Sequence, residues 1–329
     1  MKRILLIATG GTIASTEDGN GLSPALTGEE LAQSVPEISG LCELDVVQPM
    51  NIDSTNMRPS DWMRIRDVIV EGYADHDGFV ILHGTDTMSY TAAALSYLIQ
   101  DSPKPIVLTG AQKPIWFDGT DSKRNLIDAF LYACRGCGGV QIVFNGKVIL
   151  GTRARKTRTK SFNAFSSIDY PETAMFRDRR LIQFLQRPAE YTHAVFSTAL
   201  DPNVFVLRLV PGMRADIIPM LEGRYRALVL ESFGVGGLPG GDDGAMFAAV
   251  RDWCGAGHLA VFTTQVPHEG SDLAVYEVGR AAKALPGVLE AHDMTPEATA
   301  VKLMWVLGQT TDRAEAEKLF LTPVQWDIL

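Results

Sequence analysis

The 329-residue sequence has few cysteines, no long apolar run and no excess of positive charge. Four cysteines in so long a chain do not make a disulfide framework, and the C-x-x-C pair of Cys134 and Cys137 has no second pair to complete a zinc site. No apolar stretch approaches the roughly 20 residues of a membrane helix. The formal net charge of −9 argues against a general nucleic-acid surface. We therefore expect no membrane and no nucleic-acid partner.

Motifs for metals and nucleotides are also missing. The six histidines show no H-x-x-x-H or similar ligand spacing, and neither G-x-G-x-x-G nor G-x-x-x-x-G-K-[ST] follows the first apolar run. We expect no metal and no cofactor. The apolar part of the start, Ile4 to Ala8, is shorter than the usual core of a signal peptide and leads directly into a Gly-Gly-Thr segment. The start is therefore expected to be a first β-strand, and the protein to be cytoplasmic.

The first half of the chain alternates short apolar runs with longer amphipathic ones, which is typical of β-α-β units and a parallel sheet. Asn145-Gly146 between two apolar runs predicts a β-hairpin near the edge of that sheet. Helices are expected from a cap at Ser60, over 88–99 and over 120–134. The expected strands are 3–9, 43–48, 78–83, 105–110 and 139–144.

A second, smaller α/β domain is expected from about Val204, because the alternation resumes there after a stretch without clear periodicity. The sequence thus predicts an N-terminal catalytic domain over 1–187, a linker over 188–203 and a C-terminal domain over 204–329. In the second domain the expected strands are 204–210, 226–232 and 259–264, and the expected helices are 243–254, 272–284 and 296–307.

Two threonines follow glycine directly where a predicted buried strand ends. Thr12 lies in Ala8-Thr9-Gly10-Gly11-Thr12-Ile13-Ala14, and Thr85 lies in His83-Gly84-Thr85-Asp86-Thr87-Met88. The carboxyl ends of parallel strands are where ligands bind in such sheets. A threonine hydroxyl is a weak nucleophile that needs activation, while a lone threonine at a strand end is more often a local cap. Their pairing favours a threonine-based active site over two caps.

The residues around these threonines suggest how such a site could work. Gly10 and Gly11 let the backbone approach a ligand closely and offer N–H donors to an oxyanion. Residues 15–21 are polar and glycine-rich, which suits a mobile cover over bound substrate. Gly84 permits a tight turn, and Asp86 adds a carboxylate for an ammonium group.

Residues 153–160 contain five cations. This segment could be a solvated basic loop or an anion-binding patch. If Lys156 points inward, desolvation and its arginine neighbours disfavour the charged form, which makes it a candidate proton acceptor. Asp53, Ser54 and Thr55 follow another predicted strand, so they are either a helix-capping cluster or part of the same crevice.

Taken together and in this order, these segments resemble the bacterial-type L-asparaginases, over the whole chain. The resemblance rests on the two Gly-Thr segments, with further support from Glu231-Ser232-Phe233-Gly234 and 272–280. It implies a larger N-terminal domain with a flavodoxin-like sheet, a smaller C-terminal α/β domain, and a homodimer or homotetramer. Together with the predicted start and residues 51–55, it favours the cytoplasmic type.

The resemblance also implies roles for residues. Thr12 would be the nucleophile that forms an acyl-enzyme with the side-chain carbonyl of L-asparagine. Thr85, Asp86 and Lys156 would form the second catalytic network. Substrate binding would fall to Asp53, Ser54, Thr55 and Gly84, with Ser54 at the α-carboxylate and Asp86 also at the α-ammonium group.

One position departs from the family pattern. Many members carry a tyrosine in the loop after the first segment, where Leu22 stands in this chain, and no tyrosine occurs between residues 1 and 72. Proton removal from Thr12 must then involve Lys156 through Thr85, a residue from elsewhere, or water. One methylene is worth only about 1–3 kcal/mol of discrimination in a fitted pocket, which leaves room for minor glutaminase activity.

Two other functions compete with asparagine hydrolysis. The amidohydrolase subunit of a tRNA-dependent amidotransferase shares the two segments but usually has an extra N-terminal domain, for which a first strand at Ile4 would leave no room. A non-catalytic amino-acid sensor could use the same crevice, but binding alone would not require two hydroxyls beside a lysine. Both are weaker hypotheses.

Overall fold

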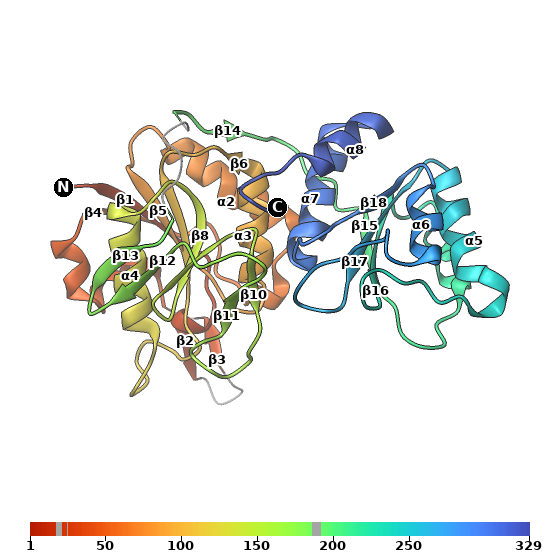
Figure 1. The fold of residues 1–329 in the computed structure, drawn as a ribbon. Coiled ribbons are helices and arrows are strands. Elements are labelled where there is room, and N and C mark those ends of the chain that lie inside the picture. The colour runs from red at the N-terminus through yellow and green to blue at the C-terminus, as the bar shows by residue number, and fades with distance from the viewer. Residues whose placement is uncertain (18–21, 25, 186–191) are drawn as a thin grey trace. The chain divides into compact units, whose positions relative to one another are not determined.

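The computed structural model describes residues 1–17, 22–24, 26–185 and 192–329. It divides the chain into two compact units, Met1–Thr198 and Ala199–Leu329 (Figure 1). The finer boundaries expected from the sequence stay a prediction, and the start of the expected linker lies outside the described residues. Among the described residues, no helix has both the length and the apolar composition needed to cross a membrane.

The N-terminal unit contains an eight-stranded mixed sheet. Five neighbouring strands are parallel, and each pairs with the next in a defined register. In the pairing of the first strand with the strand over 78–82, for example, Ile4 lies opposite Gly78. Numbered among themselves along the chain, these five have the order 2-1-3-4-5, which is flavodoxin-like. In spatial order they are β4 (Glu43–Val47), β1 (Arg3–Ala8), β5 (Gly78–Leu82), β7 (Pro105–Thr109) and β8 (Gly139–Phe144).

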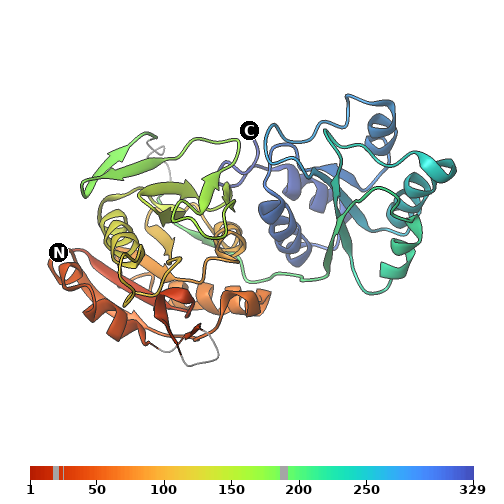
Figure 2. The same cartoon turned by 90° about the horizontal axis from the view of Figure 1, so that it is seen from below.

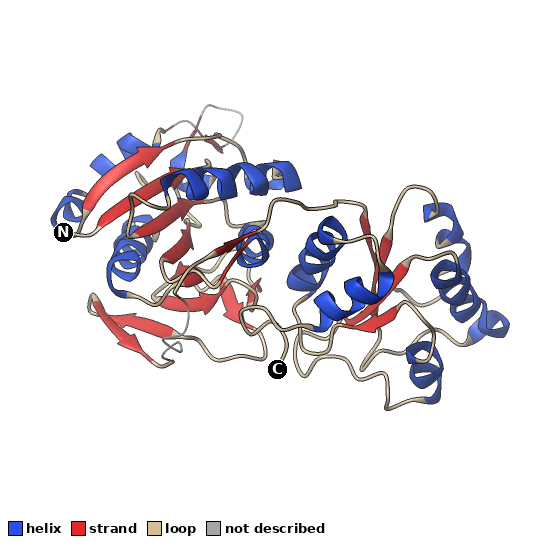
Figure 3. Cartoon of the chain, turned by 90° about the horizontal axis from the view of Figure 1, so that it is seen from above, coloured by secondary structure: helices blue, strands red, loops and turns tan. Residues whose placement is uncertain are grey.

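Helices cover both faces of this sheet, because its central strands are apolar on both sides (Figure 3). One face carries Ile4 and Leu6 of β1 and packs against α4, while Leu5 on the other face lies near the end of α2. The helices are α1 (Gly28–Gln33) and α4 (Ser122–Arg135) on the first face, and α2 (Pro59–Gly72) and α3 (Met88–Leu98) on the second.

Antiparallel strands extend the sheet beyond β8. The predicted hairpin at Asn145-Gly146 is confirmed, and it joins β8 to β9 (Lys147–Leu150). It does not form the edge, because β12 (Ala174–Arg177) pairs with β9 and β13 (Arg180–Gln183) pairs with β12 (Figure 2). The described residues of the unit also form three small two-stranded sheets: β2 (Ser15–Glu17) with β3 (Leu22–Pro24), β6 (Ile99–Gln100) with β14 (Val195–Phe196), and β10 (Ala154–Lys156) with β11 (Phe165–Ser167).

The C-terminal unit is a four-stranded parallel sheet with helices on both faces. Apolar side chains of α5, among them Val250 and Trp253, pack with Leu228, Leu230 and Phe262 of the sheet. The described elements are β15 (Val204–Arg208), β16 (Ala227–Ser232), α5 (Gly241–Gly255), β17 (Leu259–Thr264), α6 (Glu277–Lys283), β18 (Val288–Glu290), α7 (Pro296–Gln309) and α8 (Arg313–Leu321).

The predicted two-domain α/β fold is confirmed, with local differences. Ser60 does not cap α2: Pro59 takes the first helical position and Arg58 is the N-cap residue, which fits the preference of proline for a helix start. The helix expected over 272–284 covers only Glu277–Lys283. The β12–β13 hairpin, β18 and α8 were not predicted.

Candidate active site

Thr12 and Thr85 follow neighbouring parallel strands. β1 ends at Ala8 and β5 ends at Leu82, and the two strands pair directly. In the sheet, β4 lies on one side of β1 and β5 lies on the other, so the direction in which strands are added reverses at β1. The boundary between β1 and β5 is therefore the topological switch point of the sheet. Ligands in open α/β sheets bind at this point, outside the carboxyl ends of the strands. The two predicted threonine segments therefore flank the position where this fold places its ligand.

Glycines allow the segments after these strands to touch. Gly11 has a φ of +87°, and a Cβ on it would lie 2.5 Å from the Cα of Gly84. A Cβ on Gly84 would in turn lie 2.5 Å from Ser54 Oγ. Any side chain at these positions would push the segments apart. The Gly11–Gly84–Ser54 contact thus brings together the residues around Thr12, Thr85 and Ser54.

Thr12 begins a short 3₁₀ turn, Thr12–Ala14, and is half-buried. The turn is held from two sides, because Ile115 N donates to Ile13 O at 3.3 Å and Gly11 N donates to Ile52 O at 3.2 Å. The second bond corrects the expectation that the Gly11 N–H is an oxyanion donor, since a backbone carbonyl already accepts it. Gly11 instead serves the close approach of the two segments.

Lys156 joins the second threonine to a carboxylate. It lies at the end of β10, and its Nζ donates to Thr85 Oγ1 at 2.7 Å and to Asp86 Oδ1 at 2.6 Å. The Lys156 side chain is 16% exposed, whereas that of Asp86 is 58% exposed. A charged donor at these distances makes strong, directional hydrogen bonds. Lys156 thus points toward Thr85, which is the condition that the proton-acceptor hypothesis set, and its charged partner is the carboxylate of Asp86.

Gln112 also contacts Thr85, and the sequence reasoning missed it. Thr85 Oγ1 donates to Gln112 Oε1 at 3.1 Å, while Gln112 Nε2 donates to the carbonyls of Thr159 and Ser161, each at 3.1 Å. The backbone N of Gln112 donates to both carboxylate oxygens of Asp121. Gln112 follows the end of β7, so the rule that found Thr12 and Thr85 could have found it too.

The Asp53 to Thr55 segment combines capping with proximity to the site. Asp53 Oδ1 accepts hydrogen bonds from Thr55 N at 2.8 Å and Thr55 Oγ1 at 2.7 Å, as a capping cluster would. Ser54 is buried against Gly84, and its carbonyl accepts from Thr87 Oγ1 at 2.8 Å. Ser54 is thus placed beside the threonine segments, while the Asp53 and Thr55 side chains stabilise the turn.

His83 directly precedes Gly84 in the chain, and its side chain is completely buried. Its Nδ1 and Nε2 are 2.7 Å from Gly84 O and 2.8 Å from Thr91 Oγ1. Burial lowers the pKa of His83 to about 4, although the bond to the Gly84 carbonyl opposes this effect. A neutral imidazole therefore supports the turn that carries Thr85.

The five cations of residues 153–160 do not form one basic surface. Arg153 is completely buried, with its guanidinium 5.6 Å from the centre of the Tyr170 ring, and Lys156 faces Thr85. Arg158 and Lys160 are exposed. The alternative of a wholly solvated loop or a single anion patch is therefore wrong for this segment.

The loop expected to cover the site is described only in part. Its flanks form the β2–β3 hairpin, in which Glu17 pairs with Leu22. Residues 18–21 lie outside the described part of the chain, so the expected closure stays a prediction.

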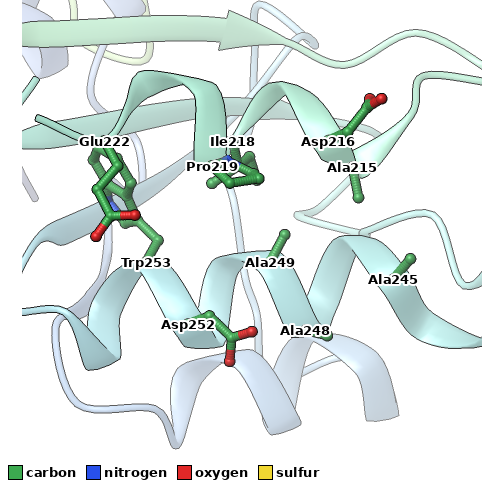
Figure 4. Close-up of a pocket in the computed structure, with 10 residues that line it drawn as sticks. All are labelled: Ala215, Asp216, Ile218, Pro219, Glu222, Ala245, Ala248, Ala249, Asp252 and Trp253. Carbon is green, nitrogen blue, oxygen red and sulfur yellow. The ribbon is translucent and has the colours of Figure 1, made fainter. Parts of the chain in front are cut away.

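The C-terminal unit has a separate hollow of about 350 Å³ between 215–222 and α5. Its floor includes three alanines of α5, and carboxylates stand around it (Figure 4). Its lining includes no hydroxyl, thiol or amine that could attack a carbonyl, so it does not compete with the threonine site. It is lined by Ala215, Asp216, Ile218, Pro219, Glu222, Ala245, Ala248, Ala249, Asp252 and Trp253.

Comparison with known proteins assigns a family to this arrangement. Residues 3–190 match the model "Asparaginase, N-terminal", and residues 203–320 match "Glutaminase/Asparaginase C-terminal domain". The chain is 38% identical over 323 residues to an L-asparaginase of Thermococcus kodakarensis, with 96% of each chain covered. It is 35% identical to a glutamyl-tRNA(Gln) amidotransferase subunit of Pyrococcus furiosus, over 97% of this chain and 75% of that one.

Solved structures agree with these matches. The thermostable L-asparaginase from Thermococcus kodakarensis superimposes with a TM-score of 0.92 at 35% identity, covering 99% of both chains. A probable cytoplasmic L-asparaginase from Campylobacter jejuni superimposes with a TM-score of 0.84 at 27% identity, covering 98% of this chain and 100% of that one. With family matches along both units and these structural likenesses, the chain belongs to the asparaginase family of amidohydrolases.

Proposed function

We propose that this protein hydrolyses the side-chain amide of free L-asparagine to L-aspartate and ammonia through an acyl-enzyme on Thr12. The observation that carries the proposal is the Lys156 Nζ, which lies within hydrogen-bond distance of both Thr85 Oγ1 and Asp86 Oδ1, beside the Gly11–Gly84 contact. A hydroxyl held by a half-buried lysine at a ligand-binding strand end suits activation of a weak oxygen nucleophile. The 38% identity to an L-asparaginase supports the same reaction.

The reaction proceeds in two balanced steps. In the first, Thr12 Oγ attacks the side-chain carbonyl carbon, its proton passes to the amide nitrogen, and ammonia leaves as the C–N bond breaks. In the second, water adds to the acyl carbon, the Thr12 ester bond breaks, and the Thr12 hydroxyl regains a proton. We assign proton movement at the attacking oxygens to Thr85, Lys156 and Asp86, with Gln112 fixing the direction of the Thr85 hydroxyl.

Substrate recognition follows from the two charges of a free amino acid. Burying either charge is costly unless an opposite or hydrogen-bonding group meets it. We place the α-ammonium group at the partly exposed Asp86 carboxylate and the α-carboxylate at Ser54. Asp53 and Thr55 stabilise the turn that carries Ser54, and Gly84 lies against Ser54, so these residues fix the position of the proposed carboxylate site. The extra methylene of glutamine is weakly discriminated in such a pocket, so minor glutaminase activity is part of the proposal.

The amidotransferase subunit is a second candidate, because the Pyrococcus furiosus relative is nearly as similar as the L-asparaginase. The chain spans only three quarters of that relative's length. We favour hydrolysis of the free amino acid because the identity to the L-asparaginase is the higher of the two, 38% against 35%. A non-catalytic sensor is disfavoured by the Lys156–Thr85 bond, which binding alone does not require.

The test measures ammonia release by the purified chain from L-asparagine and L-glutamine, separately, with and without aminoacylated tRNA. We expect turnover of L-asparagine without tRNA, slower turnover of L-glutamine, and no stimulation by tRNA. Ammonia release only with glutamine and charged tRNA would identify the amidotransferase function. Amino-acid binding without ammonia release would identify a sensor.

Assembly and location belong to the same proposal. We propose a cytoplasmic homodimer or homotetramer, supported by the likeness to the probable cytoplasmic L-asparaginase from Campylobacter jejuni and by the family resemblance. Light scattering coupled to size-exclusion chromatography measures the assembly, and a monomeric mass at the assay concentration would contradict it.

A further inference from the structure

Two cysteines that the asparagine reaction does not use lie against each other in the N-terminal unit. Cys42 directly precedes β4, and Cys134 lies in the last turn of α4. Both contribute to the same apolar cluster, and the Cys134 thiol donates to Leu41 O at 3.9 Å. The Cys42 thiol donates to Ile38 O at 4.0 Å, and each thiol shifts the pKa of the other. Two residues 92 positions apart in sequence thus place their thiols in the same apolar cluster, with Cys134 Sγ beside the carbonyl that precedes Cys42.

We propose that Cys42 and Cys134 form a reversible disulfide when a hydroperoxide oxidises the protein, with Cys134 attacking and Cys42 resolving. The assignment of roles follows exposure, because Cys134 is partly exposed whereas Cys42 is buried. An oxidant from solvent therefore meets Cys134 first. Cys42, which is buried in the same apolar cluster, then closes the bond from inside the protein.

The pKa of the Cys134 thiol is lowered, although its hydrogen bond to Leu41 O is made by the protonated form. Hydrogen bonding from Cys42, assisted by the positive charges of Arg135 and Lys2, lowers the pKa of the Cys134 thiol, whereas burial and Asp77 oppose the effect. The shared hydrogen bond and burial raise the pKa of Cys42, which therefore keeps its proton. A thiolate paired with a protonated neighbour is the arrangement that reacts with peroxides and is then resolved.

The chemistry balances in two steps. The Cys134 thiolate attacks one peroxide oxygen and breaks the O–O bond, which gives a sulfenic acid and releases hydroxide that takes up a proton. Cys42 sulfur then attacks the sulfenic sulfur, and the S–O bond breaks to release water. Overall, two thiols supply two electrons and two protons, and hydrogen peroxide becomes two waters. A small dithiol reverses the bond by exchange.

The position of the pair predicts its effect. It lies at the amino end of β4, whereas the threonine segments follow the carboxyl ends of β1 and β5. A disulfide would tie the edge strand β4 to α4 and close a loop of about 90 residues, which restricts the unfolded chain. We expect oxidation to raise the Tm by about 5 °C.

The experiment treats the full-length protein with a small excess of hydrogen peroxide and maps disulfides by mass spectrometry after blocking free thiols. We expect a Cys42–Cys134 disulfide that dithiothreitol removes, with the higher Tm measured on the same sample. Cys137→Ser should behave as wild type. In Cys42→Ser, Cys134 should proceed to sulfinic acid, and in Cys134→Ser, oxidation of Cys42 should slow at least about tenfold.

Another cysteine close to Cys134 in sequence, Cys137, could form a disulfide with it in place of Cys42. Cys137 lies three residues on, and its sulfur is 2.9 Å from Gln183 Nε2. A Cys134–Cys137 disulfide, an intermolecular disulfide, or two reduced thiols after treatment would each overturn the proposal. Cys42→Ala serves beside Cys42→Ser if the buried hydroxyl impairs folding, and the wild-type map alone still decides the pairing.

Discussion

Lys156 is the residue whose replacement separates catalysis from binding most cleanly. Lys156→Met keeps an unbranched side chain as far as the ε position but removes the Nζ that donates to Thr85 Oγ1 and Asp86 Oδ1. We expect kcat with L-asparagine to fall by about 100-fold or more, with a smaller change in KM, because we propose that the lost group moves protons. Lys160→Met, in the same basic segment but exposed, is the matched control. Equal activity of the two variants would remove Lys156 from the mechanism.

His83 gives the site segment a pH-dependent stability. Its pKa is about 4 in the folded protein, below the ordinary value of about 6.5, so the unfolded chain binds more protons between these pH values. The stability contributed by neutral His83 is complete above about pH 6.5 and is lost as pH falls toward 4.

The measurement compares wild type with His83→Gln in urea unfolding at several pH values. The free energy of unfolding of wild type, relative to the variant, should rise by about 3 kcal/mol from pH 4 to pH 7. Asp128→Asn should show the opposite slope, because burial raises the pKa of Asp128 to about 6 and its contribution is lost as pH rises. A relative stability of His83→Gln that does not change with pH would contradict this expectation.

The segments that follow β1 and β5 touch at Gly11 and Gly84, and adding one methyl group at Gly11 tests whether this contact is required. In Gly11→Ala, the Cβ would lie 2.5 Å from Gly84 Cα, and a residue with a φ of +87° would be strained. Small misplacements of catalytic groups cost about 100-fold in rate, so we expect at least that loss of kcat/KM. Gly40→Ala, where no atom lies within 4 Å of the added Cβ, should keep full activity. An active Gly11→Ala would show that this close approach is not required.

The elements that the sequence predicted well are those with strong local signals. The five buried parallel strands are long apolar runs, and the polar residues after them led to Thr12 and Thr85. The β12–β13 hairpin was missed because its turn uses Asp178 and Arg179, with φ values of 50° and 60°, where a glycine or asparagine signal was expected. Gln112 also follows the end of a predicted strand, but it was missed because no glycine–threonine pair marks that strand end.

A buried ion pair inside the C-terminal unit holds the last residues of the chain against α7. Lys302 of α7 and Asp327 are both completely buried, with Nζ and Oδ2 2.7 Å apart, and Lys302 Nζ also donates to Thr322 O. Asp327→Asn removes the carboxylate that pairs with this ammonium. We expect a loss of about 3–5 kcal/mol in the free energy of unfolding, measured in guanidinium chloride.

Asp252→Asn provides the control for this loss. Asp252 pairs with Arg251 on the same unit, but both side chains are exposed, so the change should be within about 0.5 kcal/mol. If Asp327→Asn were as stable as Asp252→Asn, the buried pair would not hold the chain end.

The hydrolysis of free L-asparagine by two threonines is tested by the initial rate of ammonia release at saturating L-asparagine, measured for wild type, Thr12→Ala and Thr85→Ala. Thr157→Ala is the matched control. Thr157 directly follows Lys156, but its hydroxyl bonds Ser166 of β11 and has no proposed role in catalysis. We predict turnover by wild type and Thr157→Ala, and rates at least about 1000-fold lower in the other two variants. Full turnover by either Thr12→Ala or Thr85→Ala would contradict the claim.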